Sequence, residues 1–216
     1  MMIRLNVLTR RSLLVFGVLA GTGCQSFGQD TDGPGMTLEY GGLIDDKSIS
    51  IKSAKLPDGK PFTNPGSIGG FGIKKWRTWR NVPTKVMAAS GDHRGLPEWV
   101  EFTWQEPAYP GLKYKDFPTR EAFDQAYEEK YAKLPFQKQR VDIKRRVPQS
   151  VVDEVVDSKR EAKPGKVANK TLWLYIFWTP DGVKMRWAMR DQAVGSPGGF
   201  GDVVHEGGDD LDRYNR

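Results

Sequence analysis

The stretch Lys170–Arg190, which reads KTLWLYIFWTPDGVKMRWAMR, decides the fold. Residues 172–178 are apolar on both alternating faces, which is typical of a central strand covered above and below. From Val183 to Met189, apolar residues alternate with mostly basic ones, so the second strand has one buried face. Between them, the proline and glycine of Thr179–Gly182 suit a tight turn. The stretch therefore predicts a β-hairpin.

Shorter segments outside this hairpin carry strand patterns. We expect strands at residues 99–104 (WVEFTW), 140–147 (RVDIKRRV) and 48–53 (SISIKS). Two further candidates are residues 37–40 (TLEY) and the segment 76–86. Together with the hairpin, these segments predict an antiparallel sheet of five to eight strands.

Two segments carry helix patterns. In TREAFDQAYEEKYAKL, Thr119 can cap the helix, and an apolar and aromatic stripe recurs at three-and-four spacing through Phe123, Tyr127 and Tyr131. A shorter helix starts at Ser150, carries valines on one side and ends before Pro164. Strands and helices without regular alternation favour an α+β fold, with both helices packed on the antiparallel sheet.

The N-terminus is typical of an export signal. Three arginines and no acidic residue precede the apolar run Leu13–Gly21. Nine helical residues are too short for a hydrocarbon core of about 30 Å, so this run is not a mature transmembrane helix. The pair Arg10-Arg11 resembles the twin-arginine export motif, although paired arginines also occur in ordinary signals.

Gly23-Cys24 resembles the cleavage site of a bacterial lipoprotein, in which the cysteine is acylated and becomes the new N-terminus. Gln25 at the next position implies transport to the outer membrane, facing the periplasm. The alternative is an ordinary secretory signal with an incidental cysteine. The predicted organisation is a signal peptide at 1–23, a flexible tether at 24–35, one α+β domain at 36–194 and a disordered tail at 195–216.

Charge and cysteine usage narrow the functional classes. The chain has 33 basic and 27 acidic residues, and the signal removes three arginines, so the mature chain carries 30 against 27, or +3. This small surplus on an exported domain makes nucleic acid a poor partner. Once Cys24 is acylated, no thiol remains for a disulfide, a zinc site or nucleophilic catalysis. We predict neither a metal site nor a cofactor.

Catalytic motifs are weak in this chain. Ser90, Asp92 and His93 have the residue types of a hydrolase triad, but three such residues within four positions are better explained as a loop. Ser67 lies in NPGSIGGFG, which lacks the first glycine of a nucleophile elbow and the lysine of a phosphate loop, and therefore indicates a turn. The sequence alone does not test whether distant carboxylates pair.

The segment Lys74–Arg80, KKWRTWR, interleaves aromatic rings with cations. Trp76, Arg77, Trp79 and Arg80 could form a binding surface for an acidic protein or a glycan, because tryptophan and arginine are favoured interface anchors. In the other interpretation, the segment is a strand with buried tryptophans and outward cations.

Three motifs together resemble a known family: GLPEWVEFTW at 95–104, VPQSVVDEV at 147–155 and LYIFWTPDGVKMRW at 174–187. They are similar to the bacterial lipoproteins grouped as domain-of-unknown-function family 2931. The resemblance implies an envelope lipoprotein, and some relatives are candidate immunity proteins against effectors of type VI secretion. An immunity protein is therefore the leading hypothesis. An envelope protein that binds peptidoglycan, glycan or another envelope component is the alternative, and a hydrolase is a third.

Overall fold

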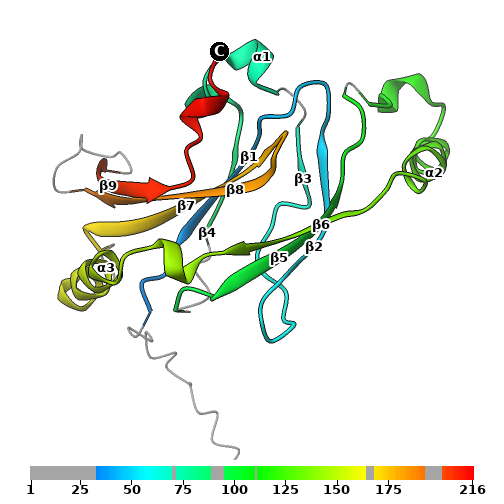
Figure 1. The fold of residues 1–216 in the computed structure, drawn as a ribbon. Coiled ribbons are helices and arrows are strands. Elements are labelled where there is room, and N and C mark those ends of the chain that lie inside the picture. The colour runs from blue at the N-terminus through cyan, green and yellow to red at the C-terminus, as the bar shows by residue number, and fades with distance from the viewer. Residues whose placement is uncertain (1–32, 70–71, 89–94, 110, 164–167, 193–200) are drawn as a thin grey trace, which may run out of the picture.

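The computed structural model describes residues 33–69, 72–88, 95–109, 111–163, 168–192 and 201–216. These residues form an α+β fold with two mostly antiparallel sheets, which confirms the expected fold class (Figure 1). The five-stranded sheet contains β4 (Lys85–Ala88), β1 (Thr37–Gly42), β7 (Lys170–Thr179), β8 (Gly182–Asp191) and β9 (Asp202–Gly208), in that order. The four-stranded sheet contains β3 (Ser67–Ile68), β2 (Ile49–Lys55), β5 (Trp99–Gln105) and β6 (Gln137–Asp142).

The predicted hairpin is present as β7 and β8, which pair from Lys170 with Asp191 to Thr179 with Gly182. Gly182 ends the turn with a φ of 94°, a conformation that glycine adopts easily. The other neighbour of β7 is β1, which runs parallel to it. A parallel pair was not expected from the sequence.

The main core lies between the two sheets. Trp178 of β7 is fully buried and contacts Phe102 and Trp104 of β5 edge to face, with ring centroids 5.3 and 6.1 Å apart. Leu174 and Ile176 of β7 belong to the same core and are also fully buried. One face of each strand therefore fills the space between the sheets, as the alternation in β8 predicted.

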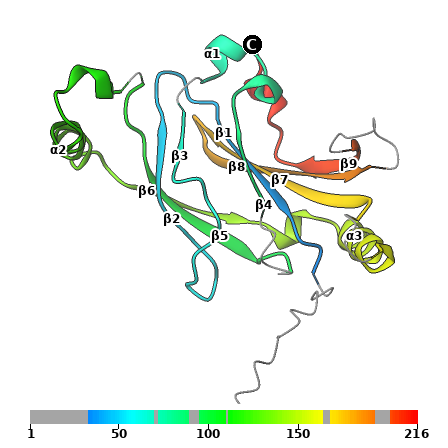
Figure 2. The ribbon, with the colours of Figure 1, turned by 180° about the vertical axis from the view of Figure 1, so that it is seen from behind.

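Helix α3 (Gln149–Glu161) is the predicted valine helix. It packs against β7, and Val151 and Val155 enter the main core. Helix α2 (Arg120–Tyr131) begins after Thr119, whose hydroxyl accepts a hydrogen bond from the Ala122 N–H, as expected of a cap. Unlike α3, α2 lies to one side of the sheets (Figures 1 and 2).

The aromatic stripe of α2 packs on residues that come shortly before the helix in the chain. Phe123 packs edge to face on Tyr114 and Phe117, from the 3₁₀ turn η2 (Tyr114–Asp116) and the residue after it. The C-terminal half of the helix is joined to the four-stranded sheet: Tyr127 forms a hydrogen bond with Ser50 of β2, and Gln105 Nε2 donates to the carbonyls of Tyr131 and Leu134 at 3.1 and 2.8 Å. Tyr131 is the one helical residue of α2 that is buried.

Two predicted strands are corrected. The segment 76–86 contains the end of α1 (Gly72–Trp76) and the 3₁₀ turn η1 (Trp79–Asn81), and strand β4 begins only at Lys85. The strand predicted at 140–147 is β6, which starts at Gln137 and ends at Asp142, before the 3₁₀ turn η3 (Lys144–Arg146).

The predicted disordered tail is wrong for residues 201–216. Strand β9 pairs with β8, and Leu211 before the 3₁₀ turn η4 (Asp212–Tyr214) is fully buried. This segment has few apolar residues, so backbone pairing and polar contacts hold much of it. Residues 193–200, most of the predicted tether and Cys24 lie outside the described residues. No helix in the described ranges is long and apolar enough to cross a membrane.

Candidate functional site

The outer face of the five-stranded sheet, which points away from the main core, carries a second apolar cluster. Trp173, Tyr175 and Phe177 alternate with the core residues of β7 and form a row of aromatic rings on this face. Trp79 from η1 lies across the row, edge to face with Tyr175 at 5.5 Å and with Phe177 at 5.6 Å. Trp79 is only 3 % exposed, so it is a core residue of this cluster.

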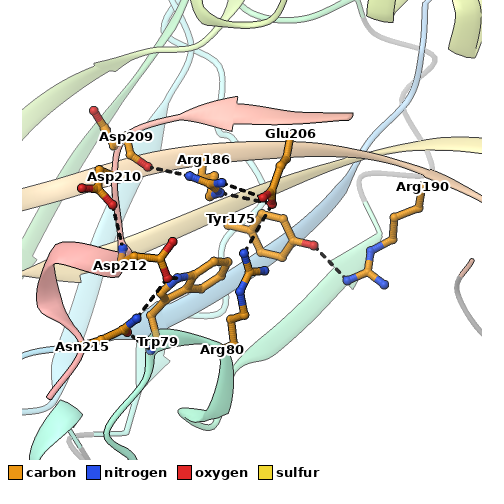
Figure 3. A network of polar contacts seen from close by, with 10 residues as sticks. All are labelled: Trp79, Arg80, Tyr175, Arg186, Arg190, Glu206, Asp209, Asp210, Asp212 and Asn215. Carbon is orange, nitrogen blue, oxygen red and sulfur yellow. Dashed lines mark hydrogen bonds and ion pairs between the residues drawn. The ribbon is translucent and has the colours of Figure 1, made fainter. Parts of the chain in front are cut away.

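The C-terminal segment, Asp209–Arg216, holds Trp79 in place (Figure 3). The indole Nε1 donates to Asp212 Oδ1 at 2.9 Å, and the Trp79 backbone N–H donates to Asn215 Oδ1 at 3.0 Å. Burial raises the pKa of Asp212, but the hydrogen bonds from Trp79 and Asn215 outweigh it, so the pKa is lowered overall. For Trp79, the interpretation as a buried structural residue is therefore the better one.

Arg80 is the exposed neighbour of Trp79. Its guanidinium lies 4.3 Å above the Trp79 ring, and half of its side chain remains exposed. Glu206 of β9 accepts from Arg186 of β8 at 2.8 Å and lies 3.5 Å from Arg80. The hydrogen bond from Arg186 is the main reason why the pKa of Glu206 is lowered.

A second arginine lies over a second ring. Arg190 stacks on Trp173, with its guanidinium 4.6 Å from the ring centre. Its Nη2 also donates to the Tyr175 hydroxyl at 3.0 Å, as Figure 3 shows. Burial raises the pKa of Tyr175. Within the described ranges, the Arg190 Nε is buried without a hydrogen-bond partner. We name this surface the arginine–aromatic layer; its members are Trp79, Arg80, Trp173, Tyr175, Arg186, Arg190 and Glu206.

The remaining two predicted binding residues lie beside the layer. Trp76 is half-buried against the same apolar cluster, and Arg77 is exposed, with a positive φ of 65°. The side chain of Arg77 makes no hydrogen bond or ion pair to any described residue. The structure thus brings Trp76, Arg77, Trp79 and Arg80 to one corner, but it buries the ring that was expected to be a contact.

Sequence reasoning missed Arg186, Arg190 and Glu206. The two arginines occupy polar positions of the alternating β8 sequence. This alternation predicted a solvent-exposed face and no specific contact. Glu206 lies in the segment that was predicted to be disordered. Its proximity to Arg80 depends on the pairing of β9 with β8, which no local sequence pattern predicts.

The catalytic candidates are not assembled by the described residues. Ser90, Asp92 and His93 lie outside them. Lys85 Nζ lies 3.4 Å from Ser67 Oγ, but both residues are exposed, whereas a lysine base needs burial to lose its proton. Glu39 and Glu206 lie three strands apart on one face, roughly 14 Å, which is too far for a glycosidase pair. Among the described residues, no three His, Cys, Asp or Glu side chains form a metal-binding group.

Comparison of the chain with protein-family models, with curated proteins and with solved structures finds no significant match. The functional argument therefore depends on the residues themselves. What their geometry defines is a surface on which two arginines are held over tryptophan rings beside a carboxylate.

Proposed function

We propose that the protein is a lipid-anchored protein of the cell envelope that acts by binding another protein, with immunity against an antibacterial effector as the leading role. The export signal and Cys24 support the compartment. The three-motif resemblance to envelope lipoproteins supports the immunity role. The arginine–aromatic layer supplies a surface with the chemistry of protein recognition.

One observation carries the binding proposal: Arg80 and Arg190 each lie over a tryptophan ring on the same sheet face. Arginine and tryptophan are enriched among the residues that dominate protein interfaces. A guanidinium that is already stacked and hydrogen-bonded loses less side-chain freedom on binding. Arginine also suits carboxylates, because its planar fork can donate two hydrogen bonds to one of them. The expected contact on the partner is therefore an acidic patch.

The position of Arg80, at one end of the arginine–aromatic layer, is compatible with an anchored protein. The described chain begins at residue 33 at one end of the molecule, whereas α1 and the C-terminus lie at the opposite end (Figures 1 and 2). The corner that contains Trp76, Arg77 and Arg80 is thus directed away from the anchor. A periplasmic partner can reach this corner while the N-terminus stays in the membrane.

The test needs the effector encoded beside this gene. We expect the mature protein to bind that effector and to protect cells that produce it in the periplasm. Arg80→Glu together with Arg190→Glu should weaken binding by about thirtyfold or more, the effect of an interface residue worth about 2 kcal/mol. Arg120→Glu is the control, because its side chain is 80 % exposed on α2, away from the layer.

Two outcomes would contradict the proposal. A growth defect on deleting the gene in a strain without the effector would indicate a housekeeping role. Equal binding by the double variant and the Arg120→Glu control would show that the layer is not the contact surface.

A second candidate function is binding of peptidoglycan or another envelope glycan. It is favoured by the exposed guanidinium of Arg77, which has no partner among the described residues and follows the half-buried Trp76 in the chain, since an aromatic ring and a cation suit an anionic glycan. In this case the mature protein should be retained on purified sacculi, and Arg77→Ala should reduce the retention.

A further inference from the structure

The outer face of the four-stranded sheet is unlike the outer face of the other sheet. Here Glu101 of β5 is surrounded by cations: Lys55 of β2 and Arg140 of β6 are its partners in register, and Lys138 Nζ lies 2.9 Å from its carboxylate. Arg140 also stacks on Trp99 with its guanidinium 3.8 Å from the ring centre. These side chains are exposed or half-exposed.

The charges on this face are unbalanced. We define the cationic face as the basic residues Lys52, Lys55, Lys138, Arg140, Lys144 and Arg145, which lie in β2, β6 and η3. The carboxylates among them are Glu98, Glu101 and Asp142. Lys52 and Lys55 make no ion pair to a described residue. The face therefore has more cations than its own carboxylates neutralise.

The place where the chain enters the domain adds an independent argument. Gly33, the first described residue, lies against α3, where its carbonyl accepts a hydrogen bond from Lys159 Nζ at 2.6 Å. In both views the coloured ribbon, which enters β1, begins on the side where β5 begins (Figures 1 and 2). From Cys24 to Gly33 the chain spans at most about 30 Å when fully extended. An acylated Cys24 therefore keeps this side of the domain near the membrane.

We propose that the cationic face docks on anionic lipid headgroups of the membrane that holds Cys24. The inference rests on the anchoring part of the proposed function, and it adds an orientation that the anchor alone does not give. Each cation close to an anionic surface strengthens its association about fivefold. Because the anchor supplies a high local concentration, such weak attractions suffice. Trp99, half-buried at the edge of the face, is the residue type found at headgroup level.

Docking in this orientation would leave the arginine–aromatic layer free, because the two outer faces belong to different sheets. A lipid-bound cationic face and a partner-bound layer are therefore compatible. The attraction is also short-ranged, since salt screens it over about 8–10 Å. Strong salt should remove the orientation while leaving the acylated protein in the membrane.

The test is lysine modification of the mature, full-length protein in vesicles, read by mass spectrometry. In vesicles that contain phosphatidylglycerol, Lys55 and Lys138 should react about fivefold more slowly than in phosphatidylcholine vesicles, and high salt should abolish the difference. Lys74, at the end that bears the C-terminus, should react equally in both. Lys52→Glu with Arg140→Glu should remove the protection of Lys55 and Lys138, whereas Lys74→Glu with Arg77→Glu, which changes the net charge equally, should keep it.

The outcomes separate the two proposals. Equal modification of Lys55 in both kinds of vesicle overturns the docking. If added sacculi protect Lys55 and anionic vesicles do not, the cationic face binds a glycan, and the docking on lipid is also overturned. A mature chain without acyl mass contradicts the anchoring instead. In that case the same labelling is repeated with the chain coupled through the Cys24 thiol to a maleimide lipid in the vesicles, which restores the local concentration and decides the docking by itself.

Discussion

The side-chain amide of Gln139 forms two hydrogen bonds with the backbone of Val183. Its Nε2 donates to the Val183 carbonyl at 2.9 Å, and its Oε1 accepts from the Val183 N–H at 2.7 Å. Strand β9 pairs with β8 from Arg186 onward, so among the described residues Val183 has no strand partner on that side. Gln139 of β6 takes the place of that partner and joins the edge of one sheet to the other.

We expect Gln139→Ala to lower the free energy of unfolding by about 1–3 kcal/mol, because it leaves two half-buried backbone groups without partners. Urea denaturation measures the effect. Gln137→Ala is the matched control, since Gln137 lies in the same strand and is exposed. If both variants unfold at the same urea concentration, Gln139 does not join the sheets.

Leu211→Ala should destabilise the protein by about 2–5 kcal/mol, as expected for a fully buried leucine. The exposed Val203 of β9 provides the control, and Val203→Ala should change stability little. Thermal unfolding of both variants checks the result. If Leu211→Ala leaves the thermal stability unchanged, the C-terminal segment is not part of the core in solution.

Acidic pH should weaken the contacts of the C-terminal segment and lower the stability of the fold. The pKa of Glu206 is lowered by the hydrogen bond from Arg186, and that of Asp212 is lowered by Trp79 and Asn215 against the effect of burial. Carboxylates with a lowered pKa stabilise the fold above their unfolded pKa, about 4, and lose this contribution as the pH falls through the folded value.

The measurement is the free energy of unfolding between pH 6 and pH 3, a range of about one to two pH units on either side of the carboxylate pKa in the unfolded chain. The wild type should lose stability toward the acidic end, and Glu206→Gln should reduce the slope. Glu121→Gln, a change on the exposed side of α2, is the control. An unchanged slope in Glu206→Gln would contradict this account.

Cys24→Ser should release the protein from membranes and abolish acyl labelling, because the thiol is the attachment point of the predicted anchor. Fractionation of cells grown with a labelled fatty acid checks this. A wild-type protein that is already soluble would favour the ordinary secretory signal, whereas a Cys24→Ser variant that still carries label would show that Cys24 is not the attachment point.

The parts of the fold that could be predicted from sequence are those with a local cause. Alternation and a proline–glycine turn predict the β7–β8 hairpin, and the valine spacing from Val151 to Val156 predicts α3. Thr119 marks the start of α2 correctly. These elements depend on neighbours within a few residues, so their sequences contain the necessary information.

The misjudged parts depend on distant contacts. The sequence around Trp76 and Trp79 suggests a strand or a binding motif, but Asp212 and Asn215 of the C-terminal segment determine where Trp79 lies. Strand β9 has little apolar pattern, because it is an edge strand whose side chains are mostly exposed. The aromatic stripe of α2 is real, but Tyr114 and Phe117 cover part of it in place of the sheet.

The parallel pairing of β1 with β7 places Thr37 beside Trp173 and Gly42 beside Trp178. The central strand of the five-stranded sheet thus comes from the far end of the chain, and contacts so distant in sequence form slowly. During translation, the ribosome must release almost the whole protein before this sheet can close. A translocon that threads unfolded chains therefore meets an open polypeptide for most of synthesis, whereas a machinery for folded cargo has to wait until the last hairpin has emerged.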